Sequence, residues 1–306
     1  MPVPGPPAPN PWLDRRVIAY AHQGGAFEGP SSTLYAIRRA LEAGATAVEL
    51  DVHATADGEL VVCHDATVEG TTEGHGRIAD MTLAEVQALD NAYWFVPGCG
   101  AVRGRPEEEY ALRGRAPDDP DLRIATVREV LAAFPGVVFN LDIKQTAPTV
   151  PPYEHALARV LAELERTDDV IVASFLDGAT ETFRRLAPGV ATSAGTLAVA
   201  SFWRAVHRGD ELPATEYLAL QVPERHGDLL VVDEAFVAAA HDRGIAVHVW
   251  TVNDAESMAR LVDLGVDGII SDVPSVLVGL LDARGVAWAP GGDVQGRATG
   301  SGSGGT

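Results

Sequence analysis

The stretch AVELDV, residues 47–52, carries two carboxylates inside an otherwise apolar segment. Successive side chains of a β-strand point to opposite faces, so Glu49 and Asp51 share one face and the aliphatic residues take the other. Two buried carboxylates aimed at one point are costly unless a cation lies between them. Hard divalent cations prefer such oxygen clusters, so the stretch predicts a metal site. The alternative is that Arg or Lys side chains of neighbouring strands pair with both carboxylates.

Eight further apolar runs recur along the chain, separated by segments with helical spacing of apolar residues. This alternation is typical of βα units on a parallel sheet. The interval between residues 52 and 60 is too short for a helical crossover and contains the turn signal Asp57-Gly58, so one of the nine runs is irregular. We therefore expect an α/β fold, a slightly irregular TIM (β/α)₈ barrel. The nine expected strands are 17–22, 47–52, 60–64, 137–143, 170–174, 190–194, 217–222, 246–251 and 267–271.

Capping residues, glycines and changes of composition indicate where helices and larger units begin and end. Helices are expected over 32–43, which a Ser/Thr cap opens and Gly44 closes, and over 255–264, which Gly265 closes. The expected units are a flexible N-terminal segment (1–14), a barrel (15–286) and a flexible Gly/Ser-rich tail (287–306). Residues 91–123 break the rhythm and predict an inserted βα loop. Such a loop is either a solvated excursion or a lid over a site.

Composition limits the classes of partner. The 306 residues carry a formal net charge of −20, which opposes nucleic acid and any other anionic ligand unless local positive charge offsets it. A bound divalent cation would supply that charge. Since no apolar run approaches the ~20 residues of a membrane span and no secretory signal opens the chain, we expect a cytoplasmic protein without a membrane span. The sequence leaves its oligomeric state open.

Further polar residues end other apolar runs. Asp142 and Lys144 share one face of the expected strand NLDIK, where they could also form a simple ion pair. His22 and His64 each end a run, and barrel active sites lie at the C-terminal ends of the strands. Two histidines there suit general acid and general base, although a lone histidine is more often structural. Trp250 either walls a pocket or packs between barrel and helix. No role is expected for the other histidines, including those at 53, 75, 226 and 248.

Several longer motifs carry a family resemblance. They are AHQGG (21–25) with Pro30 and Thr33, VELDVHATADGELVVCHD (48–65), TTEGHGRI (71–78), NLDIK (140–144), VWTVN (249–253) and GVDGIISDVP (265–274). Through them the chain resembles the glycerophosphodiester phosphodiesterase family. The resemblance implies a TIM barrel that hydrolyses glycerophosphodiesters to sn-glycerol 3-phosphate and an alcohol, or that acts on lysophospholipids as a phospholipase D.

The same resemblance implies roles for particular residues. One divalent cation (Mg²⁺ or Ca²⁺, with Mn²⁺ possible) would be held by Glu49, Asp51 and Asp142. His22 and His64 would form the catalytic pair, and Lys144 would lie at the phosphate. Gln23 and Trp250 are the other residues expected to bind the substrate. A substrate hydroxyl and water remain alternative nucleophiles.

Three positions depart from the family pattern. Gln23 stands where the family has arginine, Ser31 where it has glutamate, and Asp142 where it has glutamate. The change to Gln23 removes a bidentate phosphate clamp and its charge, which Arg103 or Arg105 of the insertion could replace. The departures leave two further interpretations open. One is a catalytically weak phosphodiester-binding protein, and the other is a lysophospholipase D-like enzyme whose aromatic insertion meets the acyl chain.

Overall fold

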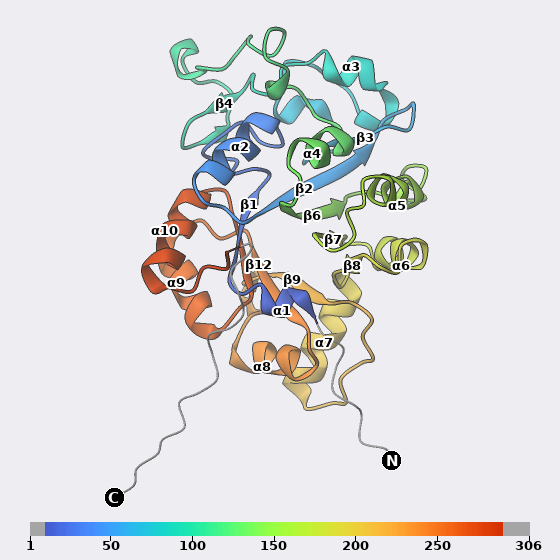
Figure 1. The fold of residues 1–306 in the computed structure, drawn as a ribbon, viewed down its shortest axis with the longest axis vertical. Coiled ribbons are helices and arrows are strands. Elements are labelled where there is room, and N and C mark those ends of the chain that lie inside the picture. The colour runs from blue at the N-terminus through green and yellow to red at the C-terminus, as the bar shows by residue number, and fades with distance from the viewer. Residues whose placement is uncertain (1–9, 290–306) are drawn as a thin grey trace, which may run out of the picture.

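The computed structural model describes residues 10–289, and eight parallel strands form a barrel surrounded by helices (Figure 1). Around the ring the strands follow chain order, and β13 pairs with β1. Between β8 and β9 the ring closes through one bridge, Ser193 to Ala219, rather than a full ladder. The predicted barrel is thereby confirmed. Its strands are β1 (Ile18–His22), β2 (Ala47–Ala54), β6 (Val138–Ile143), β7 (Val170–Ala173), β8 (Ala191–Thr192), β9 (Ala219–Pro223), β12 (Ala246–Trp250) and β13 (Gly268–Ser271).

The ninth expected run is the irregular element. It forms β3 (Leu60–Val62), which pairs antiparallel with the end of β2 through the turn at Asp57-Gly58. Because an antiparallel partner can follow a tight turn, no helical crossover is needed at this point. β3 therefore extends β2 beyond the barrel and does not join the parallel ring.

Helices follow the strands, and side chains cap the starts of both helices that the sequence predicted. The Thr33 hydroxyl accepts a hydrogen bond from Ala36 N at the start of α2, and Asp254 caps α9, which ends at Gly265 with φ of 94°. Both expected helices are thus present. The first of them, α2, begins two residues later than expected. The helices of the barrel are α2 (Leu34–Glu42), α4 (Val127–Ala133), α5 (Glu154–Glu163), α6 (Asp177–Leu186), α7 (Thr196–Arg208), α8 (Glu234–Asp242), α9 (Ala255–Leu264) and α10 (Pro274–Arg284).

A short helix closes the N-terminal end of the barrel. This helix, α1 (Pro11–Asp14), buries Trp12 against Ile18 and Tyr20 of the barrel interior. The Asn10 side chain donates hydrogen bonds to Leu218 O (2.7 Å) and Gly244 O (2.8 Å). The N-terminal segment expected to be flexible therefore contributes residues 10–14 to the fold. Residues 1–9 and residues 290–306 of the expected tail lie outside the described residues. Within the described part of that tail, Trp288 N donates a hydrogen bond to Val17 O (3.1 Å).

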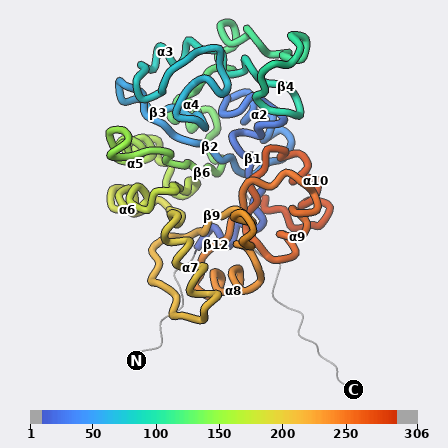
Figure 2. Tube along the Cα trace, turned by 180° about the vertical axis from the view of Figure 1, so that it is seen from behind, coloured from blue at the N-terminus to red at the C-terminus, as the bar shows by residue number. Residues whose placement is uncertain are grey.

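The long excursion between β3 and α4 packs against α2. It contains α3 (Leu83–Gln87) and the short hairpin β4 (Phe95–Val96) and β5 (Gly100–Ala101). Its apolar side chains form a small cluster of their own with Tyr35 of α2, and Asp121 accepts a hydrogen bond from Arg38 (2.9 Å). Figures 1 and 2 show β4 beside α2, at the opposite end of the molecule from α7 and α8. A second small hairpin, β10 (Arg225–His226) and β11 (Leu229–Leu230), follows β9.

Arg166, buried just before β7, joins three segments of the chain. Its guanidinium donates to Leu131 O (2.7 Å) and Val137 O (2.6 Å) and pairs with Asp169 (2.7 Å). Arg166→Met should lower the free energy of unfolding by about 3 kcal/mol, because it leaves buried carbonyls and a carboxylate without their donor. Urea denaturation measures this. Arg159→Met, at an arginine whose side chain is 64% exposed, is the control and should change stability by less than about 0.5 kcal/mol. Equal losses in the two variants would contradict the prediction.

Candidate active site

Three neighbouring strands bring the predicted polar residues together. The parallel register sets His22 of β1 beside Glu49 of β2, and Asp51 of β2 beside Asp142 of β6. Paired residues of adjacent parallel strands point to the same face, so all four side chains meet at the barrel mouth. The three carboxylate residues are at most 8% exposed. They line one cavity together with His22, His64 and Lys144.

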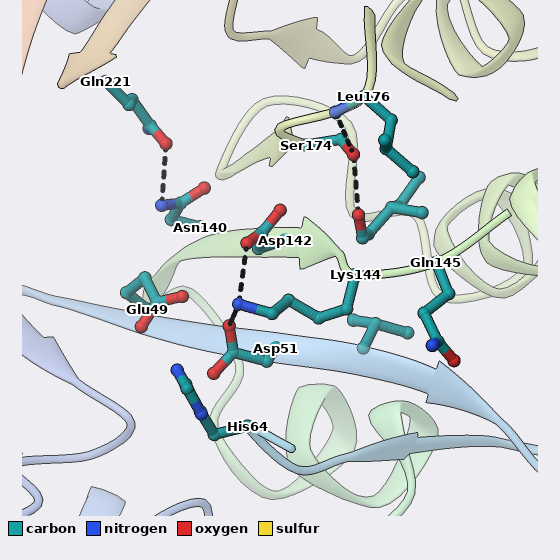
Figure 3. A network of polar contacts seen from close by, with 12 residues as sticks. Glu49, Asp51, His64, Asn140, Asp142, Lys144, Gln145, Ser174, Leu176 and Gln221 are labelled. Carbon is teal, nitrogen blue, oxygen red and sulfur yellow. Dashed lines mark hydrogen bonds and ion pairs between the residues drawn. The ribbon is translucent and has the colours of Figure 1, made fainter. Parts of the chain in front are cut away.

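Lys144 lies between two of the carboxylates (Figure 3). Its Nζ is 3.0 Å from Asp51 Oδ1 and 3.4 Å from Asp142 Oδ2. The ion pair between Asp142 and Lys144, left open as an alternative by the sequence, is therefore present. Glu49 has no such partner, and its nearest cationic neighbour is His22 Nε2 at 3.7 Å. One lysine thus faces three buried acids.

Crowding of the acids changes their ionisation. Burial, together with the charge of Asp51, raises the pKa of Glu49 to about 8. Burial also raises the pKa of Asp142 to about 6, although Lys144 opposes the rise. For Lys144, burial alone would lower the pKa, but Asp51 and Asp142 outweigh it and hold the pKa above its usual value. The cluster therefore carries more negative charge than its lysine neutralises.

The donor set suits a hard divalent cation. Asp51 Oδ2 and Asp142 Oδ1 are buried and have no hydrogen-bond partner among the described residues. Carboxylate oxygens are the ligands that Mg²⁺ and Ca²⁺ prefer, and a cation would offset the cost that raises these pKa values. As the side chains stand, with Lys144 among them, no three acidic, histidine or cysteine residues in the range 10–289 are close enough to hold a metal. The three carboxylates are therefore chemically suitable ligands for a cation. In this structure the Lys144 ammonium group occupies the space between Asp51 and Asp142.

Each histidine is held by an acidic side chain at Nδ1. His22 Nδ1 donates to Asp272 Oδ1 (2.6 Å), and Asp272 Oδ2 accepts from Asn253 Nδ2 (2.7 Å). His64 Nδ1 lies 2.8 Å from Asp65 Oδ1. An acceptor at Nδ1 sets the ring orientation and leaves Nε2 for the site. The two rings are 6.4 Å apart, centroid to centroid, and nearly perpendicular.

The environment of His22 favours its charged form. Burial by itself would lower its pKa, but the hydrogen bond to Asp272 and the negative charge of three carboxylates raise it to about 9. By contrast, burial in the barrel interior lowers the pKa of His248 to about 4. His248 is not among the cavity-lining residues, whereas His226, for which no role was expected, lies at the edge of the cavity.

The turn after His22 is locally constrained. Gln23, Gly24 and Gly25 all have positive φ, and a Cβ on Gly25 would lie 2.8 Å from Pro274 Cγ. The amides of both glycines donate to carbonyls of the turn itself. Glycine is thus needed at position 25 for close approach of the chain. The Gln23 side chain is 7% exposed, and its Nε2 is 3.2 Å from His22 Nε2, so it contacts the histidine and is not among the residues that line the cavity.

The cavity has a volume of about 550 Å³ and extends well beyond the polar cluster. Trp250 lines it and packs edge-on against Phe175, with ring centroids 5.5 Å apart. None of residues 91–123 is among its lining residues. Arg103 instead donates to Glu69 O, and Arg105 pairs with Glu109 (3.0 Å). In this structure the insertion therefore supplies neither a lid nor the arginine that could have replaced the one missing at Gln23.

Sequence reasoning missed the partners of the histidines. Asp65 directly follows His64 and could have been found from that adjacency. Asp272 and Asn253 lie in the quoted motifs GVDGIISDVP and VWTVN, yet nothing local connects either with His22, 250 residues before Asp272. Phe175 follows β7 without any motif. Only the closed barrel brings these residues to one mouth.

An eight-stranded βα barrel with acids, histidines and a lysine at the C-terminal ends of its strands has the layout of a barrel enzyme. The model of the glycerophosphoryl diester phosphodiesterase family matches residues 22–276. A glycerophosphodiester phosphodiesterase of Caldanaerobacter subterraneus is 30% identical over 268 residues, which cover 87% of this chain and 98% of that protein. The chain therefore belongs to the glycerophosphoryl diester phosphodiesterase family and is a phosphoric diester hydrolase.

Other relatives and solved structures agree. A probable glycerophosphodiester phosphodiesterase 2 of Mycobacterium tuberculosis is 30% identical, over 88% of this chain and 92% of that one. The phosphodiesterase domain of an uncharacterized M. tuberculosis protein superimposes with a TM-score of 0.71 at 19% identity, over 88% and 99% of the chains. An Oleispira antarctica phosphodiesterase, solved with the product sn-glycerol-3-phosphate, has a TM-score of 0.66 at 23% identity, over 89% and 99%. These structural likenesses support the barrel fold.

Removing the acidic partner of His22 should lower the pKa of the histidine. We expect Asp272→Asn to shift it from about 9 toward the ordinary value of about 6.5, because both the hydrogen bond to a carboxylate and its charge are lost. A raised histidine pKa adds stability that is complete below about pH 6.5 and is lost as the pH rises through about 9, so the variant should lose less stability over that interval. NMR titration of the His22 ring measures the shift. Asp80→Asn, at an exposed carboxylate, should leave the His22 pKa unchanged, and an unshifted pKa in Asp272→Asn would contradict the prediction.

Proposed function

We propose that the protein hydrolyses a glycerophosphodiester to sn-glycerol 3-phosphate and an alcohol, with a divalent cation and a histidine pair. The observation that supports this most is the register that sets His22 beside Glu49 and Asp51 beside Asp142 around one cavity. Family membership supplies the reaction class, and the neighbour solved with sn-glycerol-3-phosphate supports the product. A cytoplasmic location and a small-molecule substrate remain predictions. Within residues 10–289, no helix is both long enough and apolar enough to span a bilayer.

In the proposed mechanism the chain's own side chains bind the diester and move its protons. Lys144, at the cavity wall, binds a phosphate oxygen, and Trp250 packs against the substrate. Gln23, also expected to bind substrate, contacts His22 and does not line the cavity, so it has no direct part in this scheme. One histidine takes the proton of the attacking oxygen and the other gives a proton to the leaving alcohol, so water adds across the broken P–O bond. A cation held by Glu49, Asp51 and Asp142 would stabilise negative charge that develops on the phosphate.

Single substitutions test the histidine pair. His22→Ala and His64→Ala should each lower kcat/KM for glycerophosphocholine by at least about 100-fold, because each removes one proton-transfer group. Release of choline measures the rate. His75→Ala is the control, since its side chain is 78% exposed outside the cavity, and it should retain full activity. Near-normal turnover by either test variant would refute the proposed acid/base pair.

Metal dependence is tested by removal and by direct binding. Chelation should abolish turnover, and Mg²⁺, Ca²⁺ or Mn²⁺ should restore it. Calorimetry should show one cation bound by the wild type and a large loss of affinity in Asp51→Asn, because an amide replaces a charged ligand. The control Asp80→Asn should bind the cation normally, since its side chain is 67% exposed and does not line the cavity. Full activity in the chelated protein would contradict the proposal.

The two other interpretations have separate outcomes. Binding of diesters without turnover in every cation would favour the phosphodiester-binding protein. The lysophospholipase D interpretation depended on an aromatic insertion that meets the acyl chain, and residues 91–123 do not line the cavity. That argument is therefore lost, and hydrolysis of glycerophosphodiesters is the function that the site supports best.

A further inference from the structure

The cavity divides into two chemically different halves. Glu49, Asp51, Asp142, Lys144 and the two histidines make up the polar half. The other half, here called the apolar lobe, is lined chiefly by six residues that lie at or after the ends of later barrel strands. They are Phe175, Val199, Trp203, Leu229, Val231 and Trp250.

The lobe adjoins the reacting end of the cavity. Phe175 links the two halves, because its ring packs against Trp250 (5.5 Å) and also lies 5.7 Å from Lys144 Nζ. Val199 and Trp203 come from successive turns of α7, and Leu229 comes from the hairpin β10–β11. A group bound at Lys144 therefore continues directly into the lobe.

Large apolar side chains are exposed around this part of the mouth. Phe175 is 52% exposed, Leu197 73% and Leu229 43%. Of the seven large exposed apolar residues in the described chain, five lie in the loop after β7, the first turn of α7 or the β10–β11 hairpin. Apolar residues scattered singly over a surface are ordinary, but exposed apolar residues gathered at one cavity indicate a binding site.

The polarity of the lobe selects which arm of a diester it can hold. Among the lining residues in the described chain, the carboxylates and the lysine all lie in the polar half, and His226 is the one titratable group beyond it. The glycerol arm carries two free hydroxyls, which would lose hydrogen bonds in apolar surroundings. That arm therefore belongs with the polar half. The other ester arm, the leaving alcohol, is the one directed into the lobe.

We propose that the apolar lobe is the subsite for the leaving alcohol and that the preferred alcohol is apolar, an alkyl chain several carbons long. This inference rests on the proposed function and adds the substrate class. The cavity volume of about 550 Å³ lies within the range of about 300–1,000 Å³ that accommodates ligands of drug size. A glycerophosphodiester of a small polar alcohol would leave the lobe unfilled.

A chain-length series tests the inference. The methyl, butyl and octyl esters of glycerol 3-phosphate are compared with glycerophosphocholine as substrates of the full-length protein with its cation. We expect kcat/KM to rise by about fourfold per methylene, the equivalent of about 0.8 kcal/mol, until the lobe is filled. An octyl ester that is cleaved no faster than the methyl ester would overturn the inference.

Variants locate the preference in the lobe. Val199→Asp places a charge in it and should reduce the octyl-to-methyl ratio of kcat/KM at least tenfold. Leu229→Ser, at a residue that is 43% exposed on the hairpin, should reduce the ratio severalfold. Leu186→Ser removes an equally exposed leucine of α6 that does not line the cavity, so the wild-type ratio is expected. A ratio that is unchanged in both lobe variants, or reduced as much in the control, would overturn the assignment.

Two further measurements separate the possible failures. If a 1-acyl glycerophosphocholine is cleaved better than the octyl ester, the chain belongs on the glycerol arm and the assignment to the alcohol is wrong. If none of the four diesters is cleaved, the octyl ester included, the proposed function fails. Calorimetric binding of the octyl and methyl esters then still tests the lobe, because it needs no turnover. Tighter binding of the octyl ester, weakened in Leu229→Ser, supports the lobe, and equal binding refutes it.

Discussion

The burial of three neighbouring carboxylates is the constraint on which the site depends. Glu49 and Asp51 share one face of β2, and the parallel register of β2 with β6 sets Asp142 beside Asp51. The raised pKa values of Glu49 and Asp142 show the cost of this arrangement. Lys144 offsets part of it, and the proposed cation would offset more, because carboxylate oxygens suit it as ligands. The folding of the rest of the barrel keeps these carboxylates buried and close together despite this cost.

Acidic side chains also orient the two histidines. His22 is held at Nδ1 by Asp272, which Asn253 holds in turn, so the ring is fixed by residues from the ends of β12 and β13. His64 depends on Asp65, its neighbour in the chain. Both rings thus have a carboxylate at Nδ1, but the partner of His22 comes from a distant strand and the partner of His64 is the next residue. A histidine fixed by distant strands is sensitive to closure of the barrel, whereas one fixed by the next residue is largely local.

Chain order divides the cavity. Strands β1, β2 and β6 provide the carboxylates, the lysine and His22, whereas the segments after β7, β8 and β9 provide most of the apolar lobe. Because a barrel arranges its strands in a ring, this division along the chain becomes a division in space. The net charge of −20 makes the arrangement more consequential, since an anionic substrate is attracted chiefly by the local positive charge of Lys144 and the proposed cation.

The sequence by itself determined features that depend on neighbouring residues, namely the alternation of side chains along strands and the ends of helices. The strand period of two placed Glu49 with Asp51 and Asp142 with Lys144, because it depends on the direction of nearby side chains. A Ser/Thr cap and the glycines at 44 and 265 located two helices, the first to within two residues of its start. Only the tertiary structure decided which distant groups meet. Asp272 reaches His22, Trp12 closes the barrel floor, and the insertion packs against α2 away from the cavity. These contacts follow from strand register and ring closure, which join residues up to 250 positions apart and leave no local pattern in the chain.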